Sequence, residues 1–74
     1  MNLAYLECKI KEINIPKSTI AKKMGISRQA LYMKMKGDIE FKASEMESLC
    51  EILRLTAAEK STIFFADEVY KNGN

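Results

Sequence analysis

The sequence predicts a small all-α domain of five helices. In its first segment the apolar residues stand at helical spacing, at Leu3, Leu6, Ile10 and Ile13. Such spacing places the side chains on one face of an α-helix. No segment shows sustained alternation of apolar and polar residues, so a sheet is not expected. The breaking residues Pro16, Gly25 and Gly37 fall between the periodic segments and divide the chain into helices.

Two helices are expected before Gly25. The first covers about Asn2–Asn14 and ends there, because the residue before Pro16 is displaced from the α region. Proline is tolerated in the first turn of a helix, so a second, short helix is expected at about Lys17–Met24. Its inward-facing residues are expected to be Ile20, Ala21 and Met24.

A third helix is expected at about Arg28–Lys36. Gly25 can adopt the left-handed conformation that reverses the chain, and Ser27 is a favourable N-cap residue. Ile26, between them, is expected to be the buried residue of the turn. The helix ends at Gly37. Its inward-facing residues are expected to be Ala30, Leu31 and Met35.

The fourth helix follows a loop over residues 38–42. Its start is open, because Ser44 and Glu47 have the spacing of a capping box while Lys42 or Ala43 can equally begin it. The apolar stripe of this helix consists of Met46, Leu49, Cys50 and Leu53. Its acidic residues are expected mostly on the solvated side: Glu45, Glu47 and Glu51.

A fifth helix is expected to open at Thr56, which has capping-box spacing with Glu59. It contains Ile63, Phe64 and Phe65. Neighbouring residues on a helix diverge by about 100°, so the two phenylalanines cannot both face the core. The tail over residues 66–74 has weaker helical character, and the C-terminal helix and tail together cover residues 56–74.

Composition limits the chemistry available to the chain. The 74 residues are expected to form one domain, with 47% hydrophobic and 30% charged residues, as is ordinary for a globular fold. Two cysteines and no histidine cannot supply a four-ligand zinc site, and we expect neither a metal nor another cofactor. Cys8 and Cys50 are interpreted as buried thiols in a reduced compartment, with a disulfide between them as the alternative. No signal peptide or apolar run of about 20 residues is visible, so we expect a cytoplasmic protein with no membrane partner.

Positive charge is concentrated in the second and third helices. Residues 17–36 contain no aspartate or glutamate, and their basic residues are Lys17, Lys22, Lys23, Arg28, Lys34 and Lys36. From residue 43 onward acidic residues outnumber basic ones. A charge split of this kind suits a surface that meets a polyanion.

Residues 17–36 also have the pattern of a DNA-reading helix-turn-helix, two short helices joined by a tight glycine turn. Ala21 is small enough for the helices to cross closely, Ile26 fills the gap between them, and Leu31 anchors the third helix. The residues expected to read base edges are Arg28, Gln29, Tyr32 and Met33. For Tyr32 a phosphate contact through its hydroxyl and a plain surface position are the alternatives. Arginine can bond guanine, and glutamine adenine, through two hydrogen bonds. The residues expected to contact phosphates are Lys17, Lys22, Lys23, Ser27 and Lys36.

These residues resemble the phage repressor and Cro type of helix-turn-helix, which implies a five-helix, lambda-repressor-like DNA-binding domain. The resemblance covers about residues 15–55 and is carried by Ile20-Ala21, Gly25-Ile26-Ser27 and Leu31. One subgroup of the family is closer still, sharing Leu31-Tyr32-Met33-Lys34-Met35, Glu40-Phe41 and Ile63-Phe64-Phe65. The resemblance implies a small phage Cro-like regulator whose DNA contacts fall on Lys17, Arg28, Gln29, Tyr32 and Met33. The family usually has glutamine where this chain has Lys17, which favours a phosphate contact there over a base contact.

We expect a transcriptional regulator that binds double-stranded DNA, rather than an enzyme. The chain has no histidine for general-base work and no phosphate-binding glycine loop. The alternative is a protein-interaction module that binds a partner phage repressor through its acidic C-terminal helices and a spare phenylalanine. A homodimer is also expected, at least on DNA, because one recognition helix contacts only a few base pairs. The residues expected at its interface are Phe64 or Phe65, Val69 and Tyr70.

Overall fold

Five helices follow one another in the computed structural model, which describes residues 1–65. They are α1 (Leu3–Ile13), α2 (Lys17–Met24), α3 (Arg28–Lys36), α4 (Ala43–Leu53) and α5 (Ala57–Phe64). No strand occurs within the described range. The prediction of an all-α chain with five helices is therefore confirmed, and α2 and α3 have the predicted bounds.

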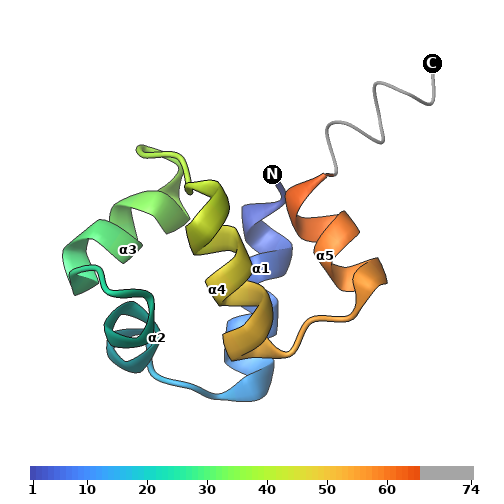
Figure 1. The fold of residues 1–74 in the computed structure, drawn as a ribbon, viewed down its shortest axis with the longest axis horizontal. Helices are drawn as coiled ribbons and strands as arrows, with labels where there is room; N and C mark the ends of the chain where they lie inside the picture. Colours follow the sequence, from blue (N-terminus) through green and yellow to red (C-terminus); the bar gives the residue numbers. More distant parts are fainter. Residues whose placement is uncertain (66–74) are drawn as a thin grey trace.

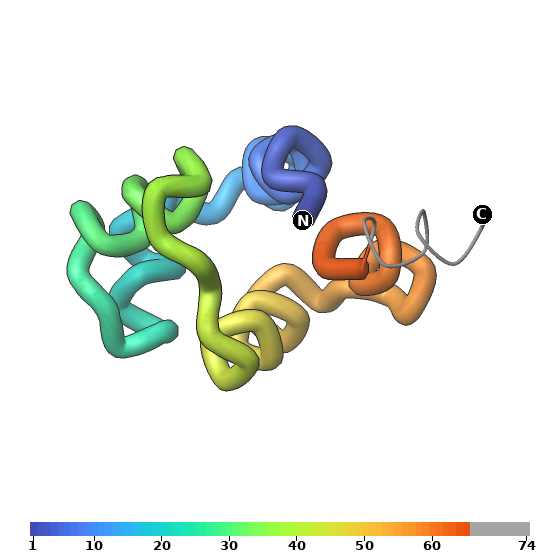
Figure 2. Tube along the Cα trace, turned by 90° about the horizontal axis from the view of Figure 1, so that it is seen from above, coloured from blue at the N-terminus to red at the C-terminus, as the bar shows by residue number. Residues whose placement is uncertain are grey.

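The helices α1 and α4 occupy the middle of the molecule, with α2 and α3 at one end and α5 at the other (Figure 1). α4 packs against α2 and α1, while α1 also packs against α3 and α5. Seen from above, α5 lies beside the start of α1 (Figure 2). A backbone hydrogen bond of 2.7 Å, from the Asn2 N–H to the Ile63 carbonyl, joins these two segments. In this arrangement no other described helix covers the outer side of the α2–α3 pair.

Local sequence explains where the helices begin. The hydroxyl oxygens of Ser27 and Thr56 accept hydrogen bonds from the N–H groups of Ala30 (3.0 Å) and Glu59 (3.1 Å). The Glu59 carboxylate in turn accepts a bond of 2.9 Å from the Thr56 N–H, which completes the predicted capping box. α2, by contrast, begins after Pro16 without any capping side chain.

Glycines in the left-handed conformation end α2 and α3, with φ of 73° at Gly25 and 90° at Gly37. After α2, the Gly25 N–H donates to the Lys22 carbonyl at 3.1 Å and the Ile26 N–H to the Ala21 carbonyl at 3.0 Å. This pair of bonds is the Schellman arrangement, which satisfies carbonyls that the end of a helix leaves open. The predicted left-handed conformation of Gly25 is confirmed.

We expect the substitution Gly25→Ala to lower the free energy of unfolding by about 1 kcal/mol. A Cβ atom at this position would meet no atom within 4 Å, so the cost comes from the left-handed backbone rather than from a clash. Urea unfolding followed by circular dichroism measures the change. Lys23→Ala, at an exposed position of α2, is the control and should stay within about 0.5 kcal/mol of the wild type. Equal stabilities of the two variants would contradict the turn conformation.

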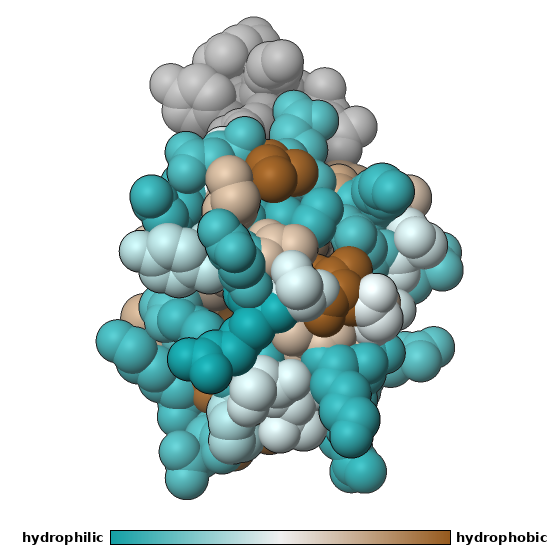
Figure 3. All heavy atoms as spheres, turned by 90° about the vertical axis from the view of Figure 1, so that its left-hand side faces the viewer, coloured by the Kyte–Doolittle hydropathy of each residue, from teal (hydrophilic) through white to brown (hydrophobic). Residues whose placement is uncertain are grey.

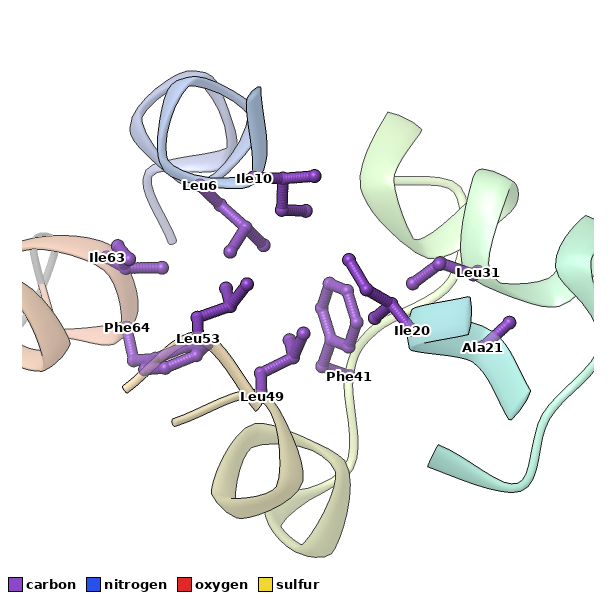
Figure 4. Close-up of a cluster of buried hydrophobic side chains, with 10 residues drawn as sticks. All are labelled: Leu6, Ile10, Ile20, Ala21, Leu31, Phe41, Leu49, Leu53, Ile63 and Phe64. Carbon is purple, nitrogen blue, oxygen red and sulfur yellow. The ribbon is translucent and has the colours of Figure 1, made fainter. Parts of the chain in front are cut away.

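All five helices contribute to the core, together with the segment before α4. Its buried side chains are Leu6, Ile10, Ile20, Ala21, Leu31, Phe41, Leu49, Leu53, Ile63 and Phe64. Residues of α1 and α4 face one another in the middle, those of α5 close one end, and those of α2 and α3 close the other (Figure 4). Phe41 projects between α2 and α4 from a segment that shows no helical periodicity, so its burial was not predicted from spacing.

Several residues predicted to face inward lie at the edge of the core instead. They are partly buried: Leu3, Ile13, Met24, Ile26, Ala30, Met35, Met46 and Cys50. A chain of this size encloses few side chains completely, because its surface is large relative to its volume. The prediction of a buried Ile26 in the turn therefore holds only in part: Ile26 is partly buried and packs against the core.

The side chains of Phe64, the last residue of α5, and Phe65, its C-cap, point in different directions, as expected. Phe64 is buried, and Phe65 is 40% exposed. The other two candidates for a homodimer contact, Val69 and Tyr70, lie outside the described residues, as does the predicted tail over residues 66–74. The homodimer therefore stays a prediction, with Phe65 as its one exposed candidate among the described residues.

The interpretation of the cysteines as two buried thiols was wrong for Cys8. Both thiols are free, but Cys8 is exposed and Cys50 is partly buried. Cys8 lies two residues after Leu6 and two before Ile10, and two helical steps of about 100° turn it away from that buried stripe. Burial raises the pKa of the Cys50 thiol.

Within residues 1–65 no cluster of possible metal-binding side chains occurs, and no helix has the length and apolarity needed to cross a membrane.

Candidate nucleic-acid interface

The predicted DNA-binding residues lie on α2, on α3 and in the turn between them. The two helices pack against each other across the turn at residues 25–27, and Ala21 and Leu31 hold them to the core. Viewed from this end, the surface is mostly hydrophilic, with small, separate hydrophobic areas (Figure 3). The chemistry of this surface therefore suits a polar partner better than an apolar one.

Three of the four predicted base-reading residues are well exposed. Arg28 and Gln29 are exposed in the first turn of α3, and Tyr32, one turn later, is 59% exposed. Met33 is partly buried, so the expectation that it points outward holds only in part. At about 100° per residue, the side chains of residues 28, 29 and 32 all project from the same half of the helix surface.

Several side chains of α2 and α3 have no partner within the described part of the chain. No ion pair or side-chain hydrogen bond within residues 1–65 involves Lys22, Lys23, Arg28 or Gln29. Three of these are cations and the fourth is an amide with both donor and acceptor groups. The hydrogen-bonding capacity of all four is therefore available to a ligand.

In contrast, the lysines at the two ends of the basic block, which covers residues 17–36, form ion pairs. Lys17 Nζ lies 2.7 Å from Glu7 Oε1 of α1. Lys36 Nζ lies 3.5 Å from Asp38 Oδ2, and it also stands 5.4 Å from the centre of the Tyr32 ring. The second contact is a cation–π interaction, which orients the ring along the exposed side of α3.

Ser27 has a structural role before any ligand is considered. Its hydroxyl oxygen accepts the Ala30 N–H and so caps α3. A hydroxyl group keeps its own hydrogen as a donor while its oxygen accepts. The predicted phosphate contact of Ser27 is therefore compatible with its capping role.

Lys34 belongs to the basic block in the sequence, but it does not lie on the exposed surface of α2 and α3. The side chain is buried, with the residue 6% exposed, and its Nζ lies 3.0 Å from Glu45 Oε1 and 3.2 Å from the Glu40 carbonyl oxygen. The interpretation of Glu45 as a solvated residue of α4 was likewise wrong, since it is only 8% exposed. Lys34 lies three residues after the buried Leu31, and Glu45 lies four residues before the buried Leu49. This spacing places both charged residues on the apolar side of their helices, a signal that the sequence analysis missed.

Glu45 joins three segments of the chain. Besides the Lys34 ammonium, its Oε1 accepts the Lys42 N–H at 2.8 Å, which fixes the start of α4 at Ala43 rather than at the alternative Ser44 cap. Burial alone would raise the pKa of the Glu45 carboxyl. The Lys42 N–H and the Lys34 ammonium outweigh burial and hold that pKa below its ordinary value of 4.5. The pair therefore fixes the end of α3 relative to the start of α4.

Removing Lys34 from the block changes the charge that the surface presents. Among the described residues, the basic side chains of residues 17–36 without an ion pair are Lys22, Lys23 and Arg28, and the exposed paired ones are Lys17 and Lys36. Lys23 lines a surface hollow together with Ser48, Glu51 and Ile52 of α4. Comparison with known proteins found no matching family, no matching curated protein and no matching solved structure. The functional assignment therefore depends on the residues of this surface and on their chemistry.

Proposed function

We propose that this chain is a sequence-specific DNA-binding transcriptional regulator of the phage Cro/repressor type. In this proposal α2 and α3 act as a helix-turn-helix, and α3 enters the major groove with Arg28 first. One observation carries it: α2 and α3 expose three cations and an amide that form no ion pair or side-chain hydrogen bond with any described residue. Free side chains of this kind are the ones that hydrogen-bond base edges and phosphates.

Base reading is assigned to the exposed side of α3. The Arg28 guanidinium can donate two hydrogen bonds to a guanine edge, and the Gln29 amide can donate to and accept from adenine. Tyr32 offers a hydroxyl group and the partly buried Met33 a small apolar contact, for which the thymine methyl group is the matching partner. The helix start enters the groove first in this docking mode, and it is where Arg28 and Gln29 lie.

Phosphate binding is assigned to the residues around that helix. Lys22 and Lys23 supply ammonium groups that pair with no described residue, and the Ser27 hydroxyl adds a neutral donor. Lys17 and Lys36 can join them only by exchanging a carboxylate partner for a phosphate. Each phosphate neutralised by a protein cation releases counterions, and that release makes the affinity fall as salt rises.

We expect the double substitution Lys22→Ala/Lys23→Ala to weaken binding to all duplex sequences to a similar extent. The slope of log affinity against log salt should become shallower by about 0.9 for each phosphate that the variant no longer neutralises. Fluorescence anisotropy with a labelled duplex, measured at several salt concentrations, gives both quantities. The matched control is Lys60→Ala on α5, which removes an exposed lysine far from the α2–α3 pair and should leave the slope unchanged.

The same titration also tests the alternative function. If the wild-type chain shows no salt-dependent affinity for any duplex, including a pool of random sequences, the DNA-binding proposal is wrong. Binding to a phage repressor protein would then be the next function to measure, with the exposed Phe65 as the first position to substitute.

A further inference from the structure

The ion pair between Lys17 and Glu7 ties the start of α2 to the middle of α1. Lys17 Nζ donates to Glu7 Oε1 at 2.7 Å, the shorter of the two ion pairs that involve exposed lysines of the basic block. The two side chains are 40% and 31% exposed, so both can reach solvent without a change of fold. A partly exposed pair is weak enough to exchange with an external partner.

The sequence of α2 explains why Glu7 is drawn to this position. The first turn of α2 has no acidic residue, and its N-cap, Pro16, supplies no capping side chain. A lysine at the first helical position adds positive charge to the positive end of the helix dipole, which is unfavourable. The Glu7 carboxylate offsets both charges from the neighbouring helix.

We propose that Glu7 limits DNA affinity by competing with backbone phosphates for Lys17; this inference rests on the proposed function. To contact a phosphate, the Lys17 ammonium must leave the carboxylate, and Glu7 then stands as an unpaired negative charge beside a polyanion. While Lys17 stays paired with Glu7 it neutralises no phosphate, so the DNA releases fewer counterions on binding and the affinity depends less on salt. Glu7 is therefore a built-in regulator of affinity and of salt sensitivity.

The test compares Glu7→Gln with the wild type on one duplex over a range of salt concentrations. The amide keeps the size of the side chain and removes its charge. We expect affinity at low salt to rise about two- to fivefold, the range for an exposed ion pair. The salt slope should become steeper by about 0.9. The control is Glu12→Gln, also on α1, whose carboxylate pairs with Lys9 at 3.5 Å rather than with the basic block.

A second background shows whether the effect passes through Lys17. In Lys17→Met, the further change Glu7→Gln should no longer raise affinity, and circular dichroism should show all variants folded. An equal rise in both backgrounds would mean that Glu7 simply repels DNA, and an unchanged or reduced affinity in Glu7→Gln alone would mean that the pair is structural. Either result overturns the inference while wild-type DNA binding stands. Absence of wild-type binding would remove the proposed function and this inference together.

Discussion

Replacing Lys34 with methionine is expected to lower the free energy of unfolding by about 3 kcal/mol. The substitution keeps an unbranched side chain of similar length but leaves the Glu45 carboxylate in the protein without its ammonium partner. Breaking a buried pair costs about 3–5 kcal/mol, and the low end applies because Lys34 lines a surface cavity of about 410 Å³. A domain of this size has a stability of only about 5 kcal/mol, so a large share would disappear. Urea unfolding measures it.

The double variant Lys34→Met/Glu45→Gln is the control for this destabilisation. Glutamine keeps a side-chain oxygen that can accept the Lys42 N–H, so the start of α4 retains its bond while the buried charge is gone. We expect the double variant to recover much of the stability that Lys34→Met loses, because a buried ion pair can often be replaced by neutral residues at little cost. If the two single changes were simply additive, the proposed coupling between Lys34 and Glu45 would be wrong.

Acid unfolding tests the Lys34–Glu45 pair through protonation of the Glu45 carboxylate. The folded-state pKa of Glu45 lies below 4.5, so the carboxylate contributes stability above that value and loses it as the pH falls through the folded-state pKa. The hydrogen bond from Lys9 also lowers the pKa of Glu59, which adds a second acid-sensitive group. The Glu45→Gln variant should therefore lose less stability than the wild type between neutral pH and the acid limb.

Most of the helical layout can be predicted from the sequence, because the signals for it are local. Pro16, Gly25 and Gly37 each act on the backbone of their own segment, and the caps at Ser27 and Thr56 bond groups three residues away. The structure places α2 and α3 at the predicted positions for this reason. Periodicity identifies the inward side of a helix, but the degree of burial depends on which neighbours cover it.

The candidate site was less predictable, because its charges depend on partners from other helices. Lys17 and Lys34 look alike in the sequence, yet one pairs with Glu7 of α1 at the surface and the other with Glu45 of α4 in the interior. Both contacts join residues ten or more positions apart, which no local pattern specifies. The burial of Phe41 has the same origin, since it projects from an irregular segment toward α2 and α4. Exposure at the start of α3 was predictable, because it follows from the helical phase of Leu31.

Sequence preference is expected to depend on Arg28 and Gln29 more than on any lysine. A bidentate contact is worth about 1–3 kcal/mol of discrimination against the wrong base, or about 5- to 150-fold in relative affinity. Both side chains are exposed in the first turn of α3 and make no bond within the described chain. Selection of duplexes from a random pool defines the preferred site, and anisotropy then compares it with single-base variants.

The expected result is that Arg28→Ala and Gln29→Ala each lose preference at particular positions of the site, while the fold measured by circular dichroism stays the same. Arg28→Lys separates charge from geometry, because lysine keeps the positive charge but cannot present the planar, two-donor fork. It should retain most of the non-specific affinity and still lose the preference at the position that Arg28 reads. Lys23→Ala is the opposite case and should weaken all duplexes equally. If Arg28→Ala also weakened every sequence by the same factor, Arg28 would bind the backbone, and base reading would have to come from Gln29, Tyr32 or Met33.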